Sequence, residues 1–373
     1  MVSYNSTHSC LCSNIHFTIA ARSHPLKKPN RKSLFNALFL IVVFALTMTA
    51  LFKGEDPARL ADSLQLAKMS CILPAVACVI LFILGESVQI LYLMRTLGQR
   101  VSFRHCCLYS FIGFFYSCIT PSASGGQPMQ VIAMRKDKIP VPVSTVVLAI
   151  ITITYKLVLV LIGLSVMLIR PEGIMRDLVG VDALVYLGLA LNVGCIALLL
   201  MLVFKPIIVR RCAEIVLTHI NHIRPFKKPD RIYRRLDELM SQYTGTAEYY
   251  RTHHLVILNV LLVTFLQRIC LFAVTWFAYR SFGLSGESAL TIITLQAMIS
   301  VVVDMLPLPG GMGISENLFL QIFEPIFGAA LVLPGLVISR GISYYTQLAI
   351  SAVMTLASTW ILRKRNDEGE HHK

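Results

Sequence analysis

Long apolar runs are the feature of this sequence that most restricts its fold. A helix needs about 20 mostly apolar residues to cross the hydrocarbon core of a bilayer, and it bonds its backbone polar groups within one segment. We therefore predict an all-α polytopic membrane protein. Six full spans are expected at Leu34–Phe52, Ser70–Met94, Val141–Ile169, Ala183–Phe204, Leu255–Phe282 and Leu333–Leu362.

The composition excludes two other classes of protein. Only 14% of the residues are charged, whereas soluble domains carry about 25% and disordered chains are more polar still. The formal net charge of +14 would indicate nucleic-acid binding in a soluble protein. Here most Lys and Arg residues fall in segments expected on the cytoplasmic side, where anionic lipids attract them. We expect no nucleic acid partner, unless tRNA is brought by a second protein.

The same charge distribution predicts the domain organisation, with both termini in the cytoplasm. The long loop between the membrane halves is expected to contain an amphipathic helix at Ile232–Tyr243. We predict a cytoplasmic basic tail at 1–33, a first membrane half at 34–204, a cytoplasmic basic loop at 205–254, a second membrane half at 255–362 and a cytoplasmic tail at 363–373.

Two apolar stretches, 106–138 and 289–327, are interrupted by Pro and Gly. Each has the form of a half-helix, a breaker and a second half-helix, and its first part is too short for a plain span. We predict two broken hairpins, either re-entrant or spanning twice, and therefore eight helical membrane elements. The breakers are Thr120-Pro121-Ser122-Ala123-Ser124-Gly125-Gly126-Gln127-Pro128 and Pro307-Leu308-Pro309-Gly310-Gly311-Met312-Gly313.

The order of these elements predicts an inverted repeat. In each half a span precedes a broken hairpin and another span follows it, but the second half begins on the opposite side of the membrane. A cation lies in the span after each hairpin, Lys156 in the first half and Arg340 in the second. Inverted repeats with interrupted segments in corresponding positions are typical of secondary transporters, which bind substrate near the bilayer midplane.

The breakers are candidate anion sites. A half-helix that starts within the membrane presents free amides and a positive dipole end, and glycine lets a phosphate approach the backbone. The alternative is that the glycines only permit close helix packing. The candidate substrate-binding residues in the breakers are Ser122, Ser124, Gly125, Gly126, Gln127, Gly310, Gly311, Gly313 and Ser315.

Six ionisable residues lie in apolar surroundings, where each costs at least about 2.5–3.5 kcal/mol to insert. Either they form structural ion pairs between helices, or they line a polar path for a charged head group. On the second interpretation three cations would bind a lipid phosphate and two acids would bind an amine, although Glu316 also suits a helix N-terminus. The six are Glu86, Lys156, Arg268, Asp304, Glu316 and Arg340, and all except Glu86 are candidate substrate-binding residues.

Signals of enzymatic chemistry are poor. His219-x-x-His222 lies in the basic loop without carboxylates at metal-ligand spacing, and Cys10 and Cys12 have no second ligand pair. No phosphate-binding loop, dinucleotide fingerprint or nucleophile elbow occurs. We predict no catalytic residue, no metal site and no cofactor.

The chain resembles the flippase-like transmembrane family named for lysylphosphatidylglycerol synthase, the membrane domain of the bacterial multiple peptide resistance factor. The resemblance covers roughly 34–362. One departure is Lys156, where the family more usually has Arg. The motifs that carry the resemblance are Pro121-Ser122-x-x-Gly125-Gly126-Gln127-Pro128, Pro309-Gly310-Gly311-Met312-Gly313-Ile314-Ser315-Glu316 and Arg340-x-x-x-Tyr344-Tyr345.

The resemblance implies a flippase in a bacterial cell membrane that moves a charged phospholipid between leaflets. In full-length relatives the cargo is lysyl-phosphatidylglycerol, which gives resistance to antimicrobial peptides. A related anionic lipid, or a polyprenyl-phosphate or glycolipid, stays open as cargo. The alternatives are phosphatidylglycerol lysyltransferase activity, an accessory subunit of that synthase, and a non-transporting scaffold. Because the chain ends soon after Leu362, we expect the transferase domain to be absent. Membrane phospholipids, a separate lipid synthase or glycosyltransferase and a second copy of the chain are the partners considered.

Overall fold

The computed structural model describes residues 62, 64–178, 180–223, 229–306 and 308–357, and within these residues every regular element is helical. Four helices are long and apolar enough to cross a membrane. They confirm four of the predicted spans to within two residues at each end, whereas the predicted span Leu34–Phe52 lies outside the described residues. The four are α3 (Met69–Thr96), α6 (Val141–Ile169), α8 (Asp182–Phe204) and α11 (His254–Ser281).

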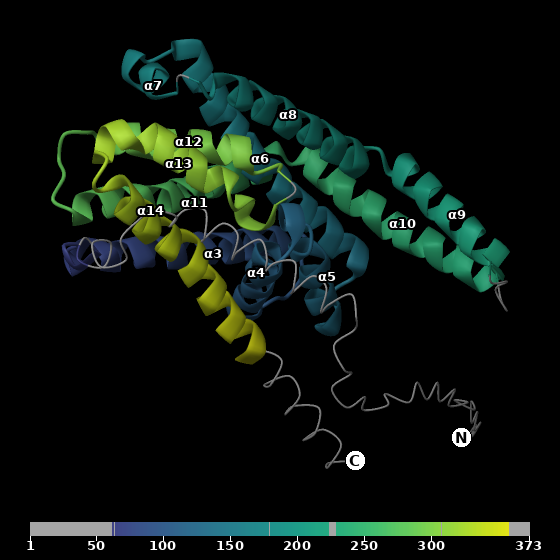
Figure 1. Cartoon of the computed structure of the whole chain (residues 1–373). Coiled ribbons are helices and arrows are strands. Elements are labelled where there is room, and N and C mark those ends of the chain that lie inside the picture. The colour runs from purple at the N-terminus through teal and green to yellow at the C-terminus, as the bar shows by residue number, and fades with distance from the viewer. Residues whose placement is uncertain (1–61, 63, 179, 224–228, 307, 358–373) are drawn as a thin grey trace, which may run out of the picture.

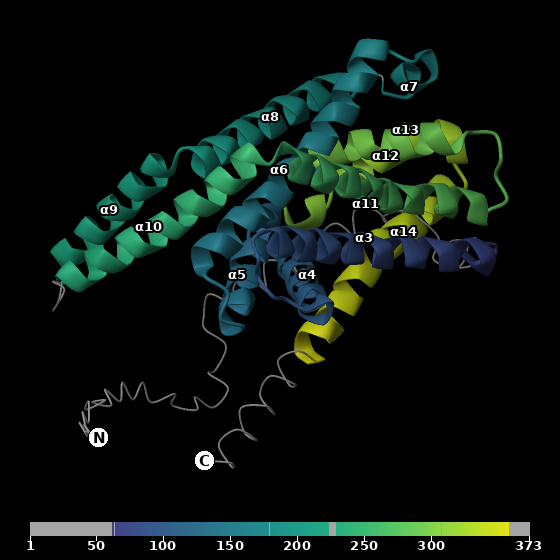
Figure 2. The same cartoon turned by 180° about the vertical axis from the view of Figure 1, so that it is seen from behind.

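Helices α3 and α11 run antiparallel and in close contact along their lengths (Figures 1 and 2). The approach is close because Gly85 has no side chain, and a Cβ there would lie 2.9 Å from Cγ of Gln267. Gln267 donates to the carbonyl oxygen of Phe82 at 2.8 Å and accepts from Gln89 Nε2 at 2.7 Å. Polar side chains inside the pair thus bond to one another, as required where water is absent.

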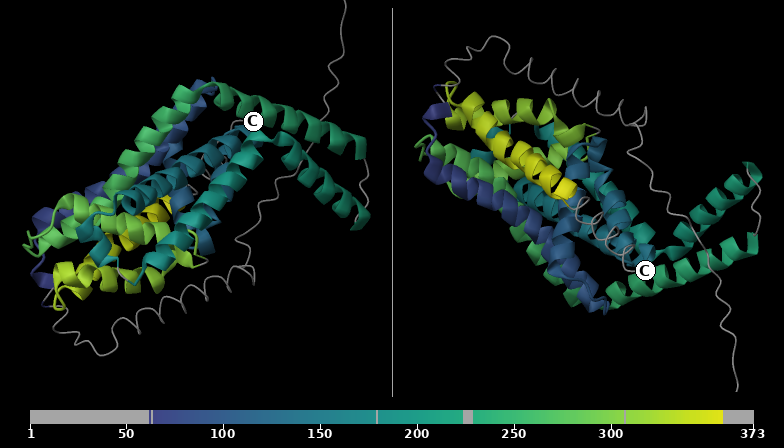
Figure 3. Two further views of the ribbon diagram at one scale, coloured as in Figure 1. Left: turned by 90° about the horizontal axis from the view of Figure 1, so that it is seen from above. Right: turned by 90° about the horizontal axis from the view of Figure 1, so that it is seen from below.

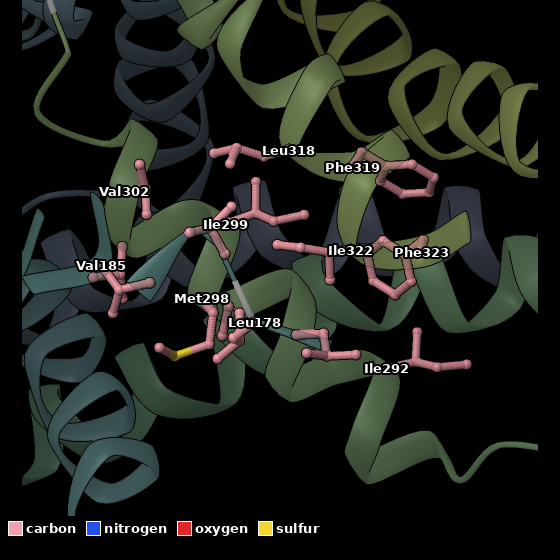
Figure 4. Packing of buried hydrophobic residues seen from close by; sticks show 14 of the residues in the cluster. Leu178, Val185, Ile292, Met298, Ile299, Val302, Leu318, Phe319, Ile322 and Phe323 are labelled. Carbon is pink, nitrogen blue, oxygen red and sulfur yellow. The ribbon is translucent and has the colours of Figure 1, made fainter. Parts of the chain in front are cut away.

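The second hairpin, α12 (Ala289–Val303) and α13 (Ile314–Phe327), forms a buried core with α6 and α8. Figure 4 shows Ile299 close to Leu318 and Met298 close to Leu178 within this cluster. A short helix, α7 (Glu172–Asp177), joins α6 to α8. Outward-facing apolar residues are left exposed on the long helices, as expected for contact with lipid. Examples are Leu184, Leu187 and Leu198 on α8 and Leu258, Leu262 and Leu266 on α11.

The basic loop folds into two helices, α9 (Pro206–Ile223) and α10 (Pro229–Thr252), that extend away from the bundle (Figure 3). The amphipathic helix predicted at Ile232–Tyr243 lies within α10, which is longer at both ends. Tyr243 donates to the carbonyl oxygen of Leu202 at 3.1 Å, and Tyr250 donates to that of Leu93 at 2.8 Å. These bonds fix α10 to the ends of α8 and α3. Burial raises the pKa of Tyr250, which keeps its hydroxyl protonated as a donor.

The last described helical segment corresponds to the predicted span Leu333–Leu362, but it is not a regular α-helix. It begins as α14 (Val332–Arg340), continues through a π-helical turn, η3 (Gly341–Thr346), and is helical again to residue 357. A π-turn widens the helix locally and is common at functional sites. Here it directly follows the Arg340 predicted to bind substrate.

Candidate functional site

Both predicted broken hairpins are broken in the structure. The first comprises α4 (Phe103–Cys118), a 3₁₀ turn η1 (Pro121–Ala123) and α5 (Gly126–Lys136). In the second, a 3₁₀ turn η2 (Pro309–Gly311) separates α12 from α13. Each turn contains a residue in the left-handed region, Ser122 with φ 51° and Gly310 with φ 59°. The chain therefore reverses at both breakers instead of continuing one helix.

The two turns lie in contact with each other, although nearly two hundred residues separate them in sequence. Ser122 donates its hydroxyl to the carbonyl oxygen of Leu306 at 3.2 Å. Tyr344 donates to the carbonyl oxygen of Cys118 at 2.9 Å, and its ring lies where a Cβ on Gly310 would come within 2.2 Å. Glycine at 310 is thus required by both its φ angle and this close ring. The contacts bring the breakers of the two halves to one place.

A cavity of about 500 Å³ lies at this meeting point. Its size is within the range of small-molecule sites, roughly 300–1,000 Å³. Side chains line it from α3, α4, α5, α6, α8, α11, α12, α13 and α14, from the π-turn η3 and from the two 3₁₀ turns. The polar lining residues include Ser117, Ser122, Ser124, Gln127, Gln130, Thr152, Tyr155, Thr275, Gln296, Ser300, Ser315, Ser343 and Gln347, and the charged ones are Glu86, Lys156, Arg268, Asp304 and Arg340.

Lys156 of α6 forms an ion pair across the cavity wall with Asp304, which follows α12. Its Nζ lies 2.6 Å from Oδ2 of Asp304, and the two side chains are 11% and 18% exposed. Because these residues belong to different halves of the chain, the pair joins the halves. Within the pair the two charges balance each other.

Arg340 is also paired, in a network that holds the second turn. Its Nη2 donates to Oε1 of Glu316 at 2.8 Å and to the carbonyl oxygen of Gly310 at 2.8 Å. The other carboxylate oxygen of Glu316 accepts from the amide of Gly313 at 2.7 Å and from the hydroxyl of Ser315 at 3.1 Å. Glu316 therefore caps α13 and occupies the helix N-terminus that sequence reasoning offered to an anion.

Arg268 of α11 is the cation that lacks an acidic partner within the described part of the chain. Its side chain lies over the Tyr155 ring, with Cζ 3.9 Å from the ring centroid, and Nη1 donates to the Tyr155 hydroxyl. The ring of Phe272 lies 4.9 Å away. Arg268 is 2% exposed, and its Nε and Nη2 have no hydrogen-bond partner among the described residues. Arg268 lines the cavity, and these two donor atoms are buried without a partner among the described residues.

Glu86 of α3 differs from the other two acids at this site. Its Oε1 accepts from Nε2 of Gln130 at 2.5 Å, and no Lys, Arg or His among the described residues lies within ion-pair distance of it. The hydrogen-bond partner of Glu86 is therefore a neutral amide, whereas Asp304 and Glu316 each have a cation as partner.

The cavity brings together ten of the fourteen residues predicted to bind substrate, and four do not line it. Gly125 and Gly126 pack where a Cβ would meet Thr120 and Ser117, within 2.6 Å and 2.1 Å. Close packing is thus the role the structure gives these two glycines. Gly313 and Glu316 form the cap of α13. The ten that line the cavity are Ser122, Ser124, Gln127, Lys156, Arg268, Asp304, Gly310, Gly311, Ser315 and Arg340.

Sequence reasoning left out other residues that line the cavity. The sequence predicts Glu86 as an ionisable residue in apolar surroundings but not as part of the site, and it does not point to Tyr155. Gln130 and Gln296 were missed. An amide side chain within or next to an apolar helix is the signal that could have found them, because such a group needs a partner inside the protein.

Comparison with known proteins gives one result. Residues 35–351 match the family described as the lysylphosphatidylglycerol synthase TM region. A comparison with curated proteins gave no match. The family match covers both broken hairpins and every charged residue of the cavity.

Proposed function

The chain belongs to the family of the lysylphosphatidylglycerol synthase TM region, and from this premise and the cavity we propose that it moves a phosphate-bearing lipid between leaflets. The head group enters the cavity while the acyl tails stay against the apolar outer faces of the helices. The cargo is a charged phospholipid, such as lysyl-phosphatidylglycerol or a related anionic lipid.

The unpaired guanidinium of Arg268 carries this proposal. Leaving a buried charge without a counter-ion costs several kcal/mol in a protein of this kind. The two aromatic rings around Arg268 offset part of that, about 2 kcal/mol each in a desolvated site. A phosphate that accepts from Nε and Nη2 would complete the site, because two parallel N–H bonds suit the guanidinium geometry.

We propose that the two halves form an inverted repeat, as the sequence predicts, and such a repeat would suit transport through this cavity. In both halves a serine caps the hairpin, since Ser102 accepts from the amide of His105 before α4 and Ser288 from that of Thr291 before α12. The paired helices α3 and α11 precede the hairpins, and α6 and α14 follow them. We propose that these units, together with α8 and the predicted Leu34–Phe52, form eight membrane elements, and that the halves alternately open the cavity to each leaflet.

The setting proposed for this activity is the bacterial plasma membrane, with both termini and the α9–α10 pair in the cytoplasm. Basic residues of α9 and α10 would then face the anionic leaflet. If the cargo is lysyl-phosphatidylglycerol, transport would reduce attraction of cationic antimicrobial peptides. The enzyme that makes the cargo, a separate synthase or glycosyltransferase, is the proposed partner.

Reconstitution tests the proposal. The purified protein is placed in vesicles with fluorescent phosphatidylglycerol, and the label in the outer leaflet is destroyed chemically. We expect a larger fraction of label to become accessible than in protein-free vesicles. Arg268→Gln should abolish this gain, whereas Arg211→Gln, an exposed site on α9, should preserve it. Equal accessibility with wild type and Arg268→Gln would reject the role of Arg268.

A role beside a synthase is the second candidate, and the family description itself favours it. Lysyl-tRNA and phosphatidylglycerol are incubated with the protein alone and with membranes from a strain that lacks it. Formation of lysyl-lipid by the protein alone would replace the transport proposal with a transferase. Loss of lysyl-lipid synthesis in the deletion membranes, restored by Arg268→Gln, would indicate an accessory subunit.

A further inference from the structure

Three carboxylates lie in or beside the cavity, and Glu86 alone among them has a neutral partner. Asp304 is held by Lys156 at 2.6 Å and Glu316 by Arg340 at 2.8 Å. Glu86 accepts from the amide of Gln130. A carboxylate inside a membrane helix with no cation beside it favours its protonated form, because burial penalises the charged one.

The charge of the cavity depends on the protonation of Glu86. The pairs Lys156–Asp304 and Arg340–Glu316 are each neutral, so Arg268 and Glu86 set the balance. With Glu86 ionised the two cancel, and with Glu86 protonated the cavity keeps one positive charge. A phosphate diester carries one negative charge. Protonation of Glu86 therefore strengthens phosphate binding at Arg268, and phosphate binding in turn favours protonation, since linkage is reciprocal.

The titratable groups that share the cavity with Glu86 cannot substitute for it. The Tyr155 hydroxyl already receives a hydrogen bond from Arg268. Lys156 and Asp304 hold each other, and α5 contributes only amides. The titratable lining groups from the elements packed against α3 are Cys118 of α4, Tyr155 and Lys156 of α6, Arg268 of α11 and Tyr344 of η3, with Asp304 and Arg340 beyond them.

We propose that Glu86 binds a proton when the lipid phosphate binds Arg268, so that lipid movement through this cavity is coupled to proton movement. The proton comes from water on the loading side and adds to the carboxylate oxygen not used by Gln130. It leaves to water on the other side when the phosphate departs. One anionic head group and one proton cross together, with no net charge moved. The inference rests on the proposed function.

The expected effect follows from this stoichiometry. One pH unit across the membrane corresponds to about 1.4 kcal/mol for one proton, which is about tenfold in an equilibrium ratio. A one-unit gradient should therefore drive fluorescent phosphatidylglycerol toward the alkaline side by up to about tenfold. This ratio is set by the coupling and not by the rate of transport.

The experiment compares steady-state leaflet ratios in proteoliposomes with a one-unit pH gradient and, for reference, in protein-free vesicles with the same gradient. Wild type and Glu324→Gln, an exposed site on α13, should accumulate the probe on the alkaline side. Glu86→Gln should give a ratio near one, because the amide cannot take up a proton but still accepts from Gln130. A gradient-dependent ratio in Glu86→Gln equal to wild type would overturn the inference.

A second measurement does not need Glu86→Gln, in case that variant does not fold. Short-chain phosphatidylglycerol is added to detergent-solubilised protein in weak buffer that contains a pH indicator. Uptake of protons on binding, lost in Arg268→Gln, supports the inference, and binding without proton uptake overturns it. If the wild type moves the probe but ignores the gradient, the coupling fails and the transport proposal stands. If it does not move the probe at all, the transport proposal fails.

Discussion

The Lys156–Asp304 pair predicts a strongly non-additive pair of substitutions. Lys156→Gln leaves the Asp304 carboxylate without its cation, and Asp304→Asn leaves the Lys156 ammonium without its anion. The side chains are only 11% and 18% exposed, so breaking the pair should cost about 3 kcal/mol, the lower end for a buried pair because the cavity is polar. The double variant carries two neutral amides that can bond to each other. Its stability should lie within about 1 kcal/mol of wild type.

A double-mutant cycle measures this coupling. Unfolding in detergent micelles is followed by far-ultraviolet circular dichroism for wild type, both single variants and the double variant. The matched control is Arg210 and Glu214 on α9, an ion pair of 2.8 Å with exposures of 50% and 41%. Coupling there should be below about 0.5 kcal/mol, because water screens an exposed pair. A cavity pair that couples no more strongly than this control would refute the assignment of Lys156 and Asp304 to structure.

Three further predictions concern stability and use the same unfolding measurement. Gly188→Ala should lower the free energy of unfolding by about 1–3 kcal/mol, because a Cβ there would lie 2.5 Å from the carbonyl oxygen of Val301. The control Gly194→Ala should leave it unchanged, since a Cβ at 194 meets nothing within 4 Å. An equal loss in both variants would contradict the packing of α8 on α12. Glu316→Gln should lower the free energy of unfolding by about 3–5 kcal/mol, since the α13 cap weakens and Arg340 loses its counter-ion. An unchanged free energy of unfolding would show that this network is dispensable. Tyr344→Phe removes the 2.9 Å bond to Cys118 and should cost about 1 kcal/mol, and unchanged stability would argue against contact between the hairpin turns.

The membrane helices could be predicted because their signal is local. A run of about 20 apolar residues with no breaker has few alternatives, and Val141–Ile169 matches the predicted span residue for residue. The breaks at Pro121 and at Gly310 could be predicted for the same reason, because several Pro and Gly residues cluster there and such a cluster does not continue a helix. The π-turn at Gly341–Thr346 could not, since no breaker residue other than one glycine marks it.

The pairing of the charged residues could not be predicted from the sequence. Lys156 and Asp304 are 148 residues apart, and nothing in either segment shows that they meet. Lys156, Arg268 and Arg340 therefore looked equivalent as phosphate ligands, whereas the structure neutralises two of them and leaves Arg268. Glu316 is different, because its position after Gly313 already indicated a place at a helix N-terminus, and the structure has it there. Arg268 lacks an acidic partner among the described residues because of which helices face it, and the tertiary fold decides which helices do so.

The most direct test of the account is a cryo-electron microscopy map of the protein in nanodiscs of phosphatidylglycerol. We predict density of phosphate size within hydrogen-bond distance of Nε and Nη2 of Arg268, between the two broken hairpins. That density should be absent from the Arg268→Gln protein prepared in the same way. A map in which Arg268 instead contacts a carboxylate of the protein, with aliphatic side chains filling the space between the turns, would contradict the account.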